Sequence, residues 1–179
     1  MTSRDRLRAL IAELAVVRGR VTLSSGAQAD WYLDLRRIAL HHAGGPLVGQ
    51  VMLDLTADWP YEAAGGLTLG ADPVATAMLH ARAAAGGPPL DAFIVRKQGK
   101  AHGLQRRIEG PDVTGRRVLA LEDTSTTGSS VLTAVEGLRE AGAEVVGVAV
   151  VVDRGAGPKV TEAGLDYRAA YTLADLGLE

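Results

Sequence analysis

Two adjacent acidic residues followed by a run of hydroxyl residues form the part of the sequence best suited to chemistry. Glu122 and Asp123 follow the aliphatic residues 118–121. After them come only small and hydroxyl residues: Thr124, Ser125, Thr126, Thr127, Gly128, Ser129 and Ser130. Small residues let backbone N–H groups approach an anion, hydroxyls add donors, and the positive end of a helix dipole favours negative charge. We therefore expect a phosphate monoester to bind here.

The two acids suit a different part of the same ligand. Carboxylates accept hydrogen bonds, so Glu122 and Asp123 match vicinal sugar hydroxyls or a magnesium shell rather than phosphate itself. The alternative interpretation is a helix cap flanked by two solvated acids. The glycine motifs of common nucleotide sites are absent, because Gly99 and Lys100 are followed by alanine and Gly155 and Gly157 lack a third glycine at the required spacing.

A basic stretch is the second candidate. Between Asp91 and Glu109 there are no acids and five basic residues: Arg96, Lys97, Lys100, Arg106 and Arg107. The stretch shows no periodicity and is rich in glycine, which predicts a long loop, and long loops in compact domains are often lids. His102 adds a proton that titrates near neutral pH. The alternative is a solvated basic loop.

The third candidate is Arg154, which follows the aliphatic residues 145–152 and Asp153. A guanidinium group holds a carboxylate with two parallel hydrogen bonds. A structural ion pair between Arg154 and Asp153 is the alternative.

The elements that must position these groups alternate between strand and helix. Uninterrupted apolar runs predict strands at residues 64–70, 92–95, 118–121 and 145–152, and helical patterns lie at about 46–57, 72–85 and 129–142. Runs that are apolar throughout are typical of parallel strands covered on both faces. We predict an α/β domain with four or five parallel strands, whose ligands bind beyond the carboxyl ends of the strands.

The first 40 residues lie outside this alternation. An apolar stripe from Leu7 to Val17 predicts a helix that ends at Gly19, with Thr2 and Asp5 as its capping pair. Residues 21–23 and 31–35 predict a short two-stranded unit. We therefore expect a single domain of residues 1–179, in which residues 1–40 form a small hood over an α/β core of residues 41–179.

Composition excludes several classes of protein. The chain has 179 residues, 47% of them hydrophobic, with 19 basic and 21 acidic side chains and no cysteine. Disulfides and thiolate chemistry are thereby excluded, and a reducing, cytoplasmic compartment is expected. No apolar run approaches the roughly 20 residues of a membrane span, and no signal or transit peptide is evident. The near-neutral charge argues against general nucleic-acid binding.

Residues 118–130 resemble the phosphoribosyl pyrophosphate (PRPP) motif of the type I phosphoribosyltransferases. The basic stretch with Arg96, Lys97, Lys100 and His102 resembles the catalytic loop of the orotate-using branch of that family. Residues 22–34 and the pair Asp153–Arg154 match the same branch, so the resemblance covers nearly the whole chain in the expected order.

The resemblance implies transfer of the 5-phosphoribosyl group of PRPP to orotate, which yields orotidine 5′-monophosphate and pyrophosphate in de novo pyrimidine (UMP) biosynthesis. It implies that Mg²⁺ is held mainly through PRPP, with no direct protein site, and that the enzyme is a homodimer. Glu122 and Asp123 would hold the ribose hydroxyls, and Thr124 through Ser130 would wrap the 5-phosphate. Thr126 and Arg154 would contact orotate.

By the same resemblance, Arg96 and Lys97 would contact the pyrophosphate of PRPP. Lys100 and His102 would be catalytic and would close over the active site of the partner subunit. The turn at Gly70, Ala71 and Asp72 would receive the pyrophosphate. Some family members carry lysines at Ser24 and near this turn, so here pyrophosphate binding is expected to depend more on Arg96, Lys97, Lys100 or magnesium. An aromatic pair is partly replaced, because Leu33 follows Tyr32.

Three other functions stay open from the sequence. One is a phosphoribosyltransferase for a purine or uracil, which would not need the carboxylate-binding Arg154. Another is a PRPP-sensing regulator without catalysis, which would be expected to lack Lys100 and His102 and to carry a basic nucleic-acid face. The third is a non-catalytic flavodoxin-like binding module.

Overall fold

A six-stranded sheet with strand order β5-β4-β3-β6-β7-β8 forms the centre of the protein. The computed structural model describes residues 1–22, 28–97 and 107–178. The strands are β3 (Ala63–Leu67), β4 (Asp91–Val95), β5 (Ile108–Glu109), β6 (Arg117–Ser125), β7 (Glu144–Asp153) and β8 (Tyr167–Thr172). Within this six-stranded sheet, β5 pairs with β4 in the antiparallel direction, and the other described pairs are parallel. The predicted α/β fold with a mainly parallel sheet is confirmed.

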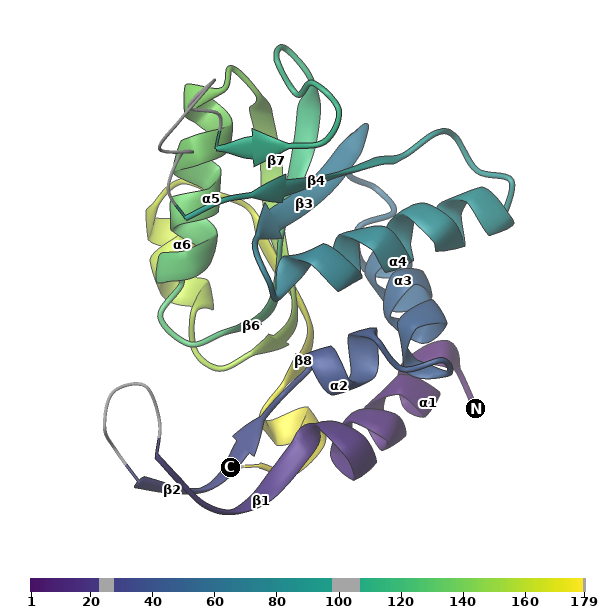
Figure 1. The fold of residues 1–179 in the computed structure, drawn as a ribbon, viewed down its shortest axis with the longest axis vertical. Helices are drawn as coiled ribbons and strands as arrows, with labels where there is room; N and C mark the ends of the chain where they lie inside the picture. Colours follow the sequence, from purple (N-terminus) through teal and green to yellow (C-terminus); the bar gives the residue numbers. More distant parts are fainter. Residues whose placement is uncertain (23–27, 98–106, 179) are drawn as a thin grey trace.

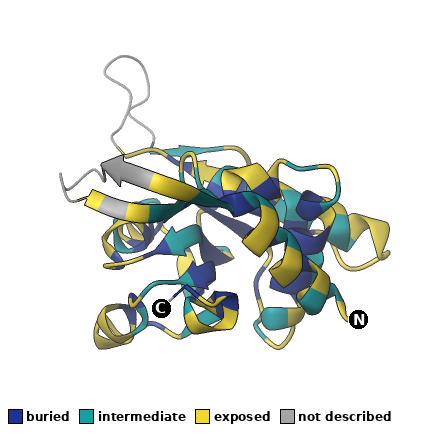
Figure 2. Cartoon of the chain, turned by 90° about the horizontal axis from the view of Figure 1, so that it is seen from below, coloured by how far each residue is buried: buried dark blue, intermediate teal, exposed yellow. Residues whose placement is uncertain are grey.

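Helices cover both faces of this sheet (Figure 1). On one face lie α3 (Gly44–Leu55) and α4 (Ala71–Ala84), and on the other lie α5 (Ser129–Glu140) and α6 (Gly157–Glu162). Two apolar clusters fill the spaces between the sheet and these helices, the first beneath α3 and α4 and the second beneath α5 and α6. The side chains of β6 alternate between them: Leu119 and Leu121 lie in the first cluster, whereas Val118 and Ala120 lie in the second. Figure 2 shows the buried residues at the centre of the fold and exposed ones on the outer sides of the helices. Burial on both faces explains the uninterrupted apolar strands of the sequence.

The N-terminal segment contributes to the first of these clusters. It comprises α1 (Ser3–Leu10), a π-helical turn η1 (Ile11–Ala15), and an antiparallel pair made of β1 (Val16–Thr22) and β2 (Gln28–Leu33). The predicted capping box of Thr2 and Asp5 is present. Leu7 and Ile11 are fully buried with residues of α3 and the sheet. The Tyr171 hydroxyl of β8 donates to the Arg4 carbonyl oxygen at 2.7 Å, which holds the two ends of the chain together.

Several predicted boundaries and elements are wrong. The first helix ends before Val16, because Val16 and Val17 extend to pair with Leu33 and Tyr32 of β2. Residues 122–125 belong to β6, which continues as far as its neighbour β7 does, so that Ser125 lies opposite Asp153. Four described elements were not predicted: α2 (Arg36–Ala39), α6, β8 and the 3₁₀ turn η2 (Ala174–Leu176). The predicted loop also ends in the two-residue strand β5.

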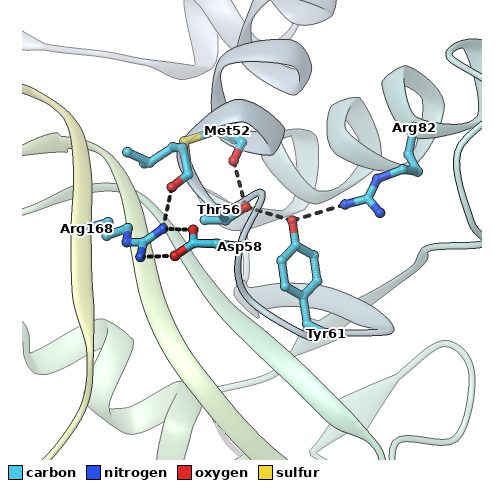
Figure 3. Close-up of polar contacts among 7 residues, drawn as sticks. Met52, Thr56, Asp58, Tyr61, Arg82 and Arg168 are labelled. Carbon is cyan, nitrogen blue, oxygen red and sulfur yellow. Dashed lines mark hydrogen bonds and ion pairs between the residues drawn. The ribbon is translucent and has the colours of Figure 1, made fainter.

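At the amino ends of the strands, a polar cluster braces the loop between α3 and β3 (Figure 3). The buried Thr56 hydroxyl donates to the Met52 carbonyl oxygen at 2.8 Å and lies 2.7 Å from the Tyr61 hydroxyl. Nearby, Arg168 of β8 binds both carboxylate oxygens of Asp58 and donates to the Leu55 carbonyl oxygen. This edge is opposite the carboxyl ends of the strands.

Within the described residues, no helix combines the length and the apolar character that crossing a membrane requires.

Candidate active site

A cavity of about 590 Å³ opens at the carboxyl ends of β3 and β6. Its walls come from three parts of the chain: the segment after β2, the turn after β3, and the junction of β6 with α5. The residues that line it are Leu33, Asp34, Arg36, Leu67, Thr68, Leu69, Gly70, Glu122, Asp123, Thr124 and Ser130. Of the predicted site residues, the structure thus brings Glu122, Asp123, Thr124 and Ser130 together with Gly70 in one cavity.

The two acids are held in place by the backbone around them. Glu122 is only 6% exposed and its Oε1 accepts from the Asp123 N–H at 3.3 Å, while Asp123 Oδ1 accepts from the Thr124 N–H at 2.7 Å. A Cβ atom at Gly70 would lie 2.5 Å from Asp123 Oδ1 and 3.0 Å from Glu122 Oε1. A side chain at this position would therefore displace either the turn after β3 or the Asp123 carboxylate.

Burial changes the proton affinity of this pair. Desolvation, followed by the Asp123 charge, raises the pKa of Glu122 to about 8. Desolvation also raises the pKa of Asp123, against hydrogen bonds and the Arg36 charge, which lower it. Among the described residues, the buried Thr124 hydroxyl has no hydrogen-bond partner. Because buried polar groups usually have a hydrogen-bond partner, the unpaired Thr124 hydroxyl suits a polar ligand in this cavity.

The hydroxyl run ends at the start of α5. Gly128 is the N-cap residue with φ of 73°, a conformation that favours glycine, and it offers no side chain to the first N–H groups of the helix. The Thr127 hydroxyl donates to Ser129 Oγ at 3.0 Å, and Lys159 Nζ of α6 lies 3.4 Å from the same oxygen. Hydroxyls, helix N–H groups and a lysine therefore meet at one point, as an anion requires.

Arg154 lies beside the end of β6. Its N–H donates to the Ser125 carbonyl oxygen at 2.8 Å, and a Cβ at the next residue, Gly155, would be 3.8 Å from the Thr126 carbonyl oxygen. The guanidinium lies 5.7 Å from the ring centroid of Trp31 of β2, and its buried Nε has no partner in the described chain. Asp153 instead accepts from the N–H groups of Gly155 and Ala156. No ion pair between Asp153 and Arg154 occurs among the described residues.

The basic stretch is described only at its two ends. The Arg96 N–H donates to the Arg107 carbonyl oxygen at 2.7 Å, and the Arg96 side chain pairs with Glu109 at 3.6 Å. Arg96 and Lys97 do not line the cavity in this structure. The predicted catalytic residues Lys100 and His102, as well as Ser24, lie outside the described residues.

Three site residues were missed by the sequence reasoning. Asp34 and Arg36 line the cavity, and Lys159 adjoins the hydroxyl run. Asp34 accepts from the Tyr32 hydroxyl and from Arg36 Nε, both at 2.9 Å. The only sequence signal was the arginine pair Arg36–Arg37 directly after the two-stranded unit. A short helix gives no periodicity, so nothing in the pattern indicated which arginine faces the ligand.

Comparison with known proteins identifies the family. The model of the phosphoribosyl transferase domain matches residues 64–167. An orotate phosphoribosyltransferase of Streptomyces avermitilis is 66% identical over 172 residues, covering 94% of each chain. The Mycobacterium tuberculosis H37Rv enzyme of the same name is 60% identical over 178 residues, covering 98% of this chain and 97% of the relative.

Solved structures agree with this result. A crystal structure of the Mycobacterium tuberculosis orotate phosphoribosyltransferase in complex with PRPP has a TM-score of 0.86 and 54% identity, covering 99% of this chain and 100% of that one. An adenine phosphoribosyltransferase of Thermoanaerobacter pseudethanolicus, at 12% identity and a TM-score of 0.68, shares the fold. With its acid pair, hydroxyl run and mainly parallel sheet, the chain belongs to the phosphoribosyl transferase family, among the orotate phosphoribosyltransferases.

Proposed function

We infer that this chain transfers the 5-phosphoribosyl group of PRPP to orotate, forming orotidine 5′-monophosphate and pyrophosphate in pyrimidine biosynthesis. The observation that carries this inference is the pair formed by the buried Glu122 and the half-buried Asp123, which lines one cavity together with Ser130 and the turn at Gly70. PRPP has the matching order of groups: a 5-phosphate, a ribose diol and a pyrophosphate.

Each part of the cavity suits one of these groups. The residues from Thr124 to Ser130 and the first N–H groups of α5 are proposed to bind the 5-phosphate, because hydroxyls and helix N–H groups donate to its oxygens. Glu122 and Asp123 accept hydrogen bonds from the 2′- and 3′-hydroxyls. The turn at Gly70 approaches within contact distance of these acids, which supports the proposal that its backbone meets the pyrophosphate.

The reaction breaks the C1′–O bond of PRPP and forms a bond from C1′ to a ring nitrogen of orotate. Positive charge develops at the sugar while negative charge grows on the departing pyrophosphate. Lys100, His102, Arg96 and Lys97 are proposed to stabilise that negative charge, and a preorganised donor of this kind contributes roughly 3–4 kcal/mol to the transition state. Closure of the basic loop would also exclude water, which otherwise hydrolyses PRPP.

Magnesium fits this site as an ion brought in by PRPP. Among the described residues, no group of three or more His, Cys, Asp or Glu side chains is arranged to hold a metal. Glu122 and Asp123 offer only oxygen atoms, which Mg²⁺ prefers, and Mg²⁺ usually binds one or two carboxylates together with substrate phosphates. When bound, it would neutralise charge on the pyrophosphate.

Orotate recognition is assigned to Arg154 and Thr126. The buried Nε of Arg154 is without a partner in the described chain, so its guanidinium can donate to the orotate carboxylate. This feature favours orotate over uracil and hypoxanthine, which carry no carboxylate.

We propose that the working unit is a homodimer with a shared apolar groove. A groove of about 780 Å³ runs along α2 and α4, and its apolar lining includes Leu40, Pro46, Leu69, Pro73, Ala77 and Ala81. Leu40 is 75% exposed and Leu69 is 68% exposed. Arg36 and Leu69 line both the groove and the cavity. A second copy seated there would stand beside the cavity, as a loop acting in trans requires.

Two experiments test the dimer. Leu40→Asp is expected to convert the dimer to monomers in sedimentation velocity experiments, because a charge would be buried in the apolar interface.

The second experiment tests whether Lys100 acts on the partner subunit. Homodimers of Lys100→Ala and of Asp123→Asn are mixed, dissociated and reassociated. If Lys100 serves the partner, each heterodimer contains one intact site and activity returns. If Lys100 serves its own subunit, no intact site forms and activity stays at the level of the parents.

We also propose that residues 1–40 act as a hood on one domain with residues 41–179, and that the protein is cytoplasmic. The shared burial of Leu7 and Ile11 with the core supports the first proposal, and the absence of cysteine supports the second.

The decisive experiment for the reaction follows the loss of orotate absorbance after PRPP and Mg²⁺ are added. Turnover is expected with orotate and not with uracil or hypoxanthine. Equal turnover of uracil would contradict the role of Arg154, and no turnover of orotate would contradict the proposed reaction.

A further inference from the structure

We propose that Arg36 binds the pyrophosphate group of PRPP and supplies the cation that the turn at residues 70–72 lacks. The inference rests on the proposed function and extends it to a residue of α2. The turn itself is formed by Gly70, Ala71 and Asp72, which carry no positive charge.

The position of Arg36 follows from the lining of the cavity. Ser130 lies where the 5-phosphate is expected, and Glu122 and Asp123 lie at the ribose. Thr68, Leu69 and Gly70 form the remaining side. Arg36 lines this cavity and also shares the neighbouring groove with Leu69 and Asp72. It therefore stands next to the turn, at the pyrophosphate end of the ligand.

The charged residues of the cavity wall also favour Arg36 as the group that binds the pyrophosphate. Its described lining residues include three acids, Asp34, Glu122 and Asp123, and a single basic residue, Arg36. The acids of the wall repel a polyphosphate that enters this cavity. Among the described lining residues, Arg36 has the only side chain that attracts it. The Arg36 charge already acts on Asp123, where it opposes the rise in pKa that burial causes.

Arg36 is held in a way that leaves its outer nitrogens available. Its Nε donates to Asp34 Oδ1 at 2.9 Å, and Asp34 is fixed in turn by the Tyr32 hydroxyl at 2.9 Å. Within the described chain, the contact of Arg36 with a carboxylate is made by Nε alone, and the guanidinium also acts on the nearby Tyr32 hydroxyl, whose pKa it lowers against the effect of Asp34. The two terminal nitrogens are thus paired with no carboxylate of the described residues. They can therefore form the paired bonds that a guanidinium makes with phosphate oxygens.

A purely structural role explains these contacts less well. The Arg36 side chain is 48% exposed, and exposed ion pairs contribute little to folding. Arg37 is the matched control, because it is the next residue of the same helix, carries the same charge, is exposed, and lines neither the cavity nor the groove.

The test measures binding by titration calorimetry with three probes: PRPP with Mg²⁺, pyrophosphate with Mg²⁺, and ribose 5-phosphate. In Arg36→Ala, affinity for PRPP and pyrophosphate is expected to fall about tenfold to a hundredfold, because a hydrogen bond between charged groups is lost. Affinity for ribose 5-phosphate is expected to stay within about twofold. Arg36→Lys should recover part of the loss, and Arg37→Ala should match the wild type.

Two outcomes overturn the assignment. One is unchanged pyrophosphate affinity in Arg36→Ala. The other is an equal loss of ribose 5-phosphate affinity, which would indicate a distorted cavity. Sedimentation velocity of Arg36→Ala checks that its assembly is intact, since Arg36 also lines the groove. Turnover of orotate by the wild type distinguishes this inference from the proposed function. If the wild type turns over orotate and Arg36→Ala keeps its affinity for pyrophosphate, only the role of Arg36 is refuted.

Discussion

Replacing Glu122 with glutamine should stabilise the protein while weakening its binding of PRPP. The Glu122 carboxyl is 6% exposed, and burial raises its pKa from the ordinary 4.5 to about 8. A raised carboxyl pKa means that the folded state holds a proton that the unfolded state has already released. The free energy of unfolding therefore falls as pH rises from about 4.5 to about 8, and is constant outside that window as far as this group is concerned.

The magnitude follows from the same shift. Each pH unit above the ordinary pKa costs the folded state about 1.4 kcal/mol until the raised pKa is reached. At pH 7 the penalty is about 3 kcal/mol, which Glu122→Gln removes because the amide does not ionise. For a chain of this size, 1 kcal/mol corresponds to about 2–4 °C in Tm, so an increase of about 6–12 °C is expected.

Thermal unfolding of both proteins from pH 4.5 to pH 8.5 tests this reasoning. The difference in Tm should be near zero at pH 4.5 and should grow up to pH 8. Glu136→Gln is the matched control, because Glu136 is exposed on α5 and its replacement should give no pH-dependent difference. Calorimetry should show PRPP affinity reduced at least about tenfold in Glu122→Gln, since an amide NH₂ group, which only donates, replaces a carboxyl oxygen that can accept from a ribose hydroxyl. A Tm difference that does not depend on pH would refute the argument.

Three further predictions concern the cavity and its loop. Gly70→Ala should weaken PRPP binding at least about tenfold in calorimetry, because the new methyl group would lie 2.5 Å from Asp123 Oδ1; unchanged affinity would mean that the turn moves freely away from the acids. Lys100→Ala should lower kcat about a hundredfold or more in the orotate assay with little change in Tm, and an unchanged kcat would remove Lys100 from catalysis. Arg154→Ala should lower kcat/KM for orotate about a hundredfold while leaving PRPP affinity within about threefold; a matching loss of PRPP affinity would place Arg154 in PRPP binding instead.

The parts of the fold that the sequence predicted well are those whose pattern comes from burial. Strands β3, β6 and β7 are covered on both faces and appear as uninterrupted apolar runs. The run of β4 is also apolar, although Ile94 is exposed on one of its faces. Helices α3, α4 and α5 begin within about two residues of the predicted starts, because proline, an acidic residue and glycine mark their first turns.

The errors arise where a tertiary contact overrides the local pattern. The first helix was extended through Val17 by its apolar spacing, yet pairing with β2 makes Val16 and Val17 extended. β6 continues through polar residues because β7 runs beside it to Asp153. The hydroxyl run and acid pair were found because their residue types are distinctive. Arg36 was missed because its place in the cavity depends on how the N-terminal segment packs against the sheet.

The polar cluster of Thr56, Tyr61 and Arg168 has a consequence for how this protein can evolve. It lies at the amino edge of the sheet, whereas the acids and the hydroxyl run lie at the carboxyl edge. Substitutions at the amino edge can therefore raise thermal stability without altering substrate affinity. Substitutions at the carboxyl edge can change the substrate range while the polar cluster compensates for the stability that they cost. Selection for heat resistance and selection for a new base would draw on separate sets of positions.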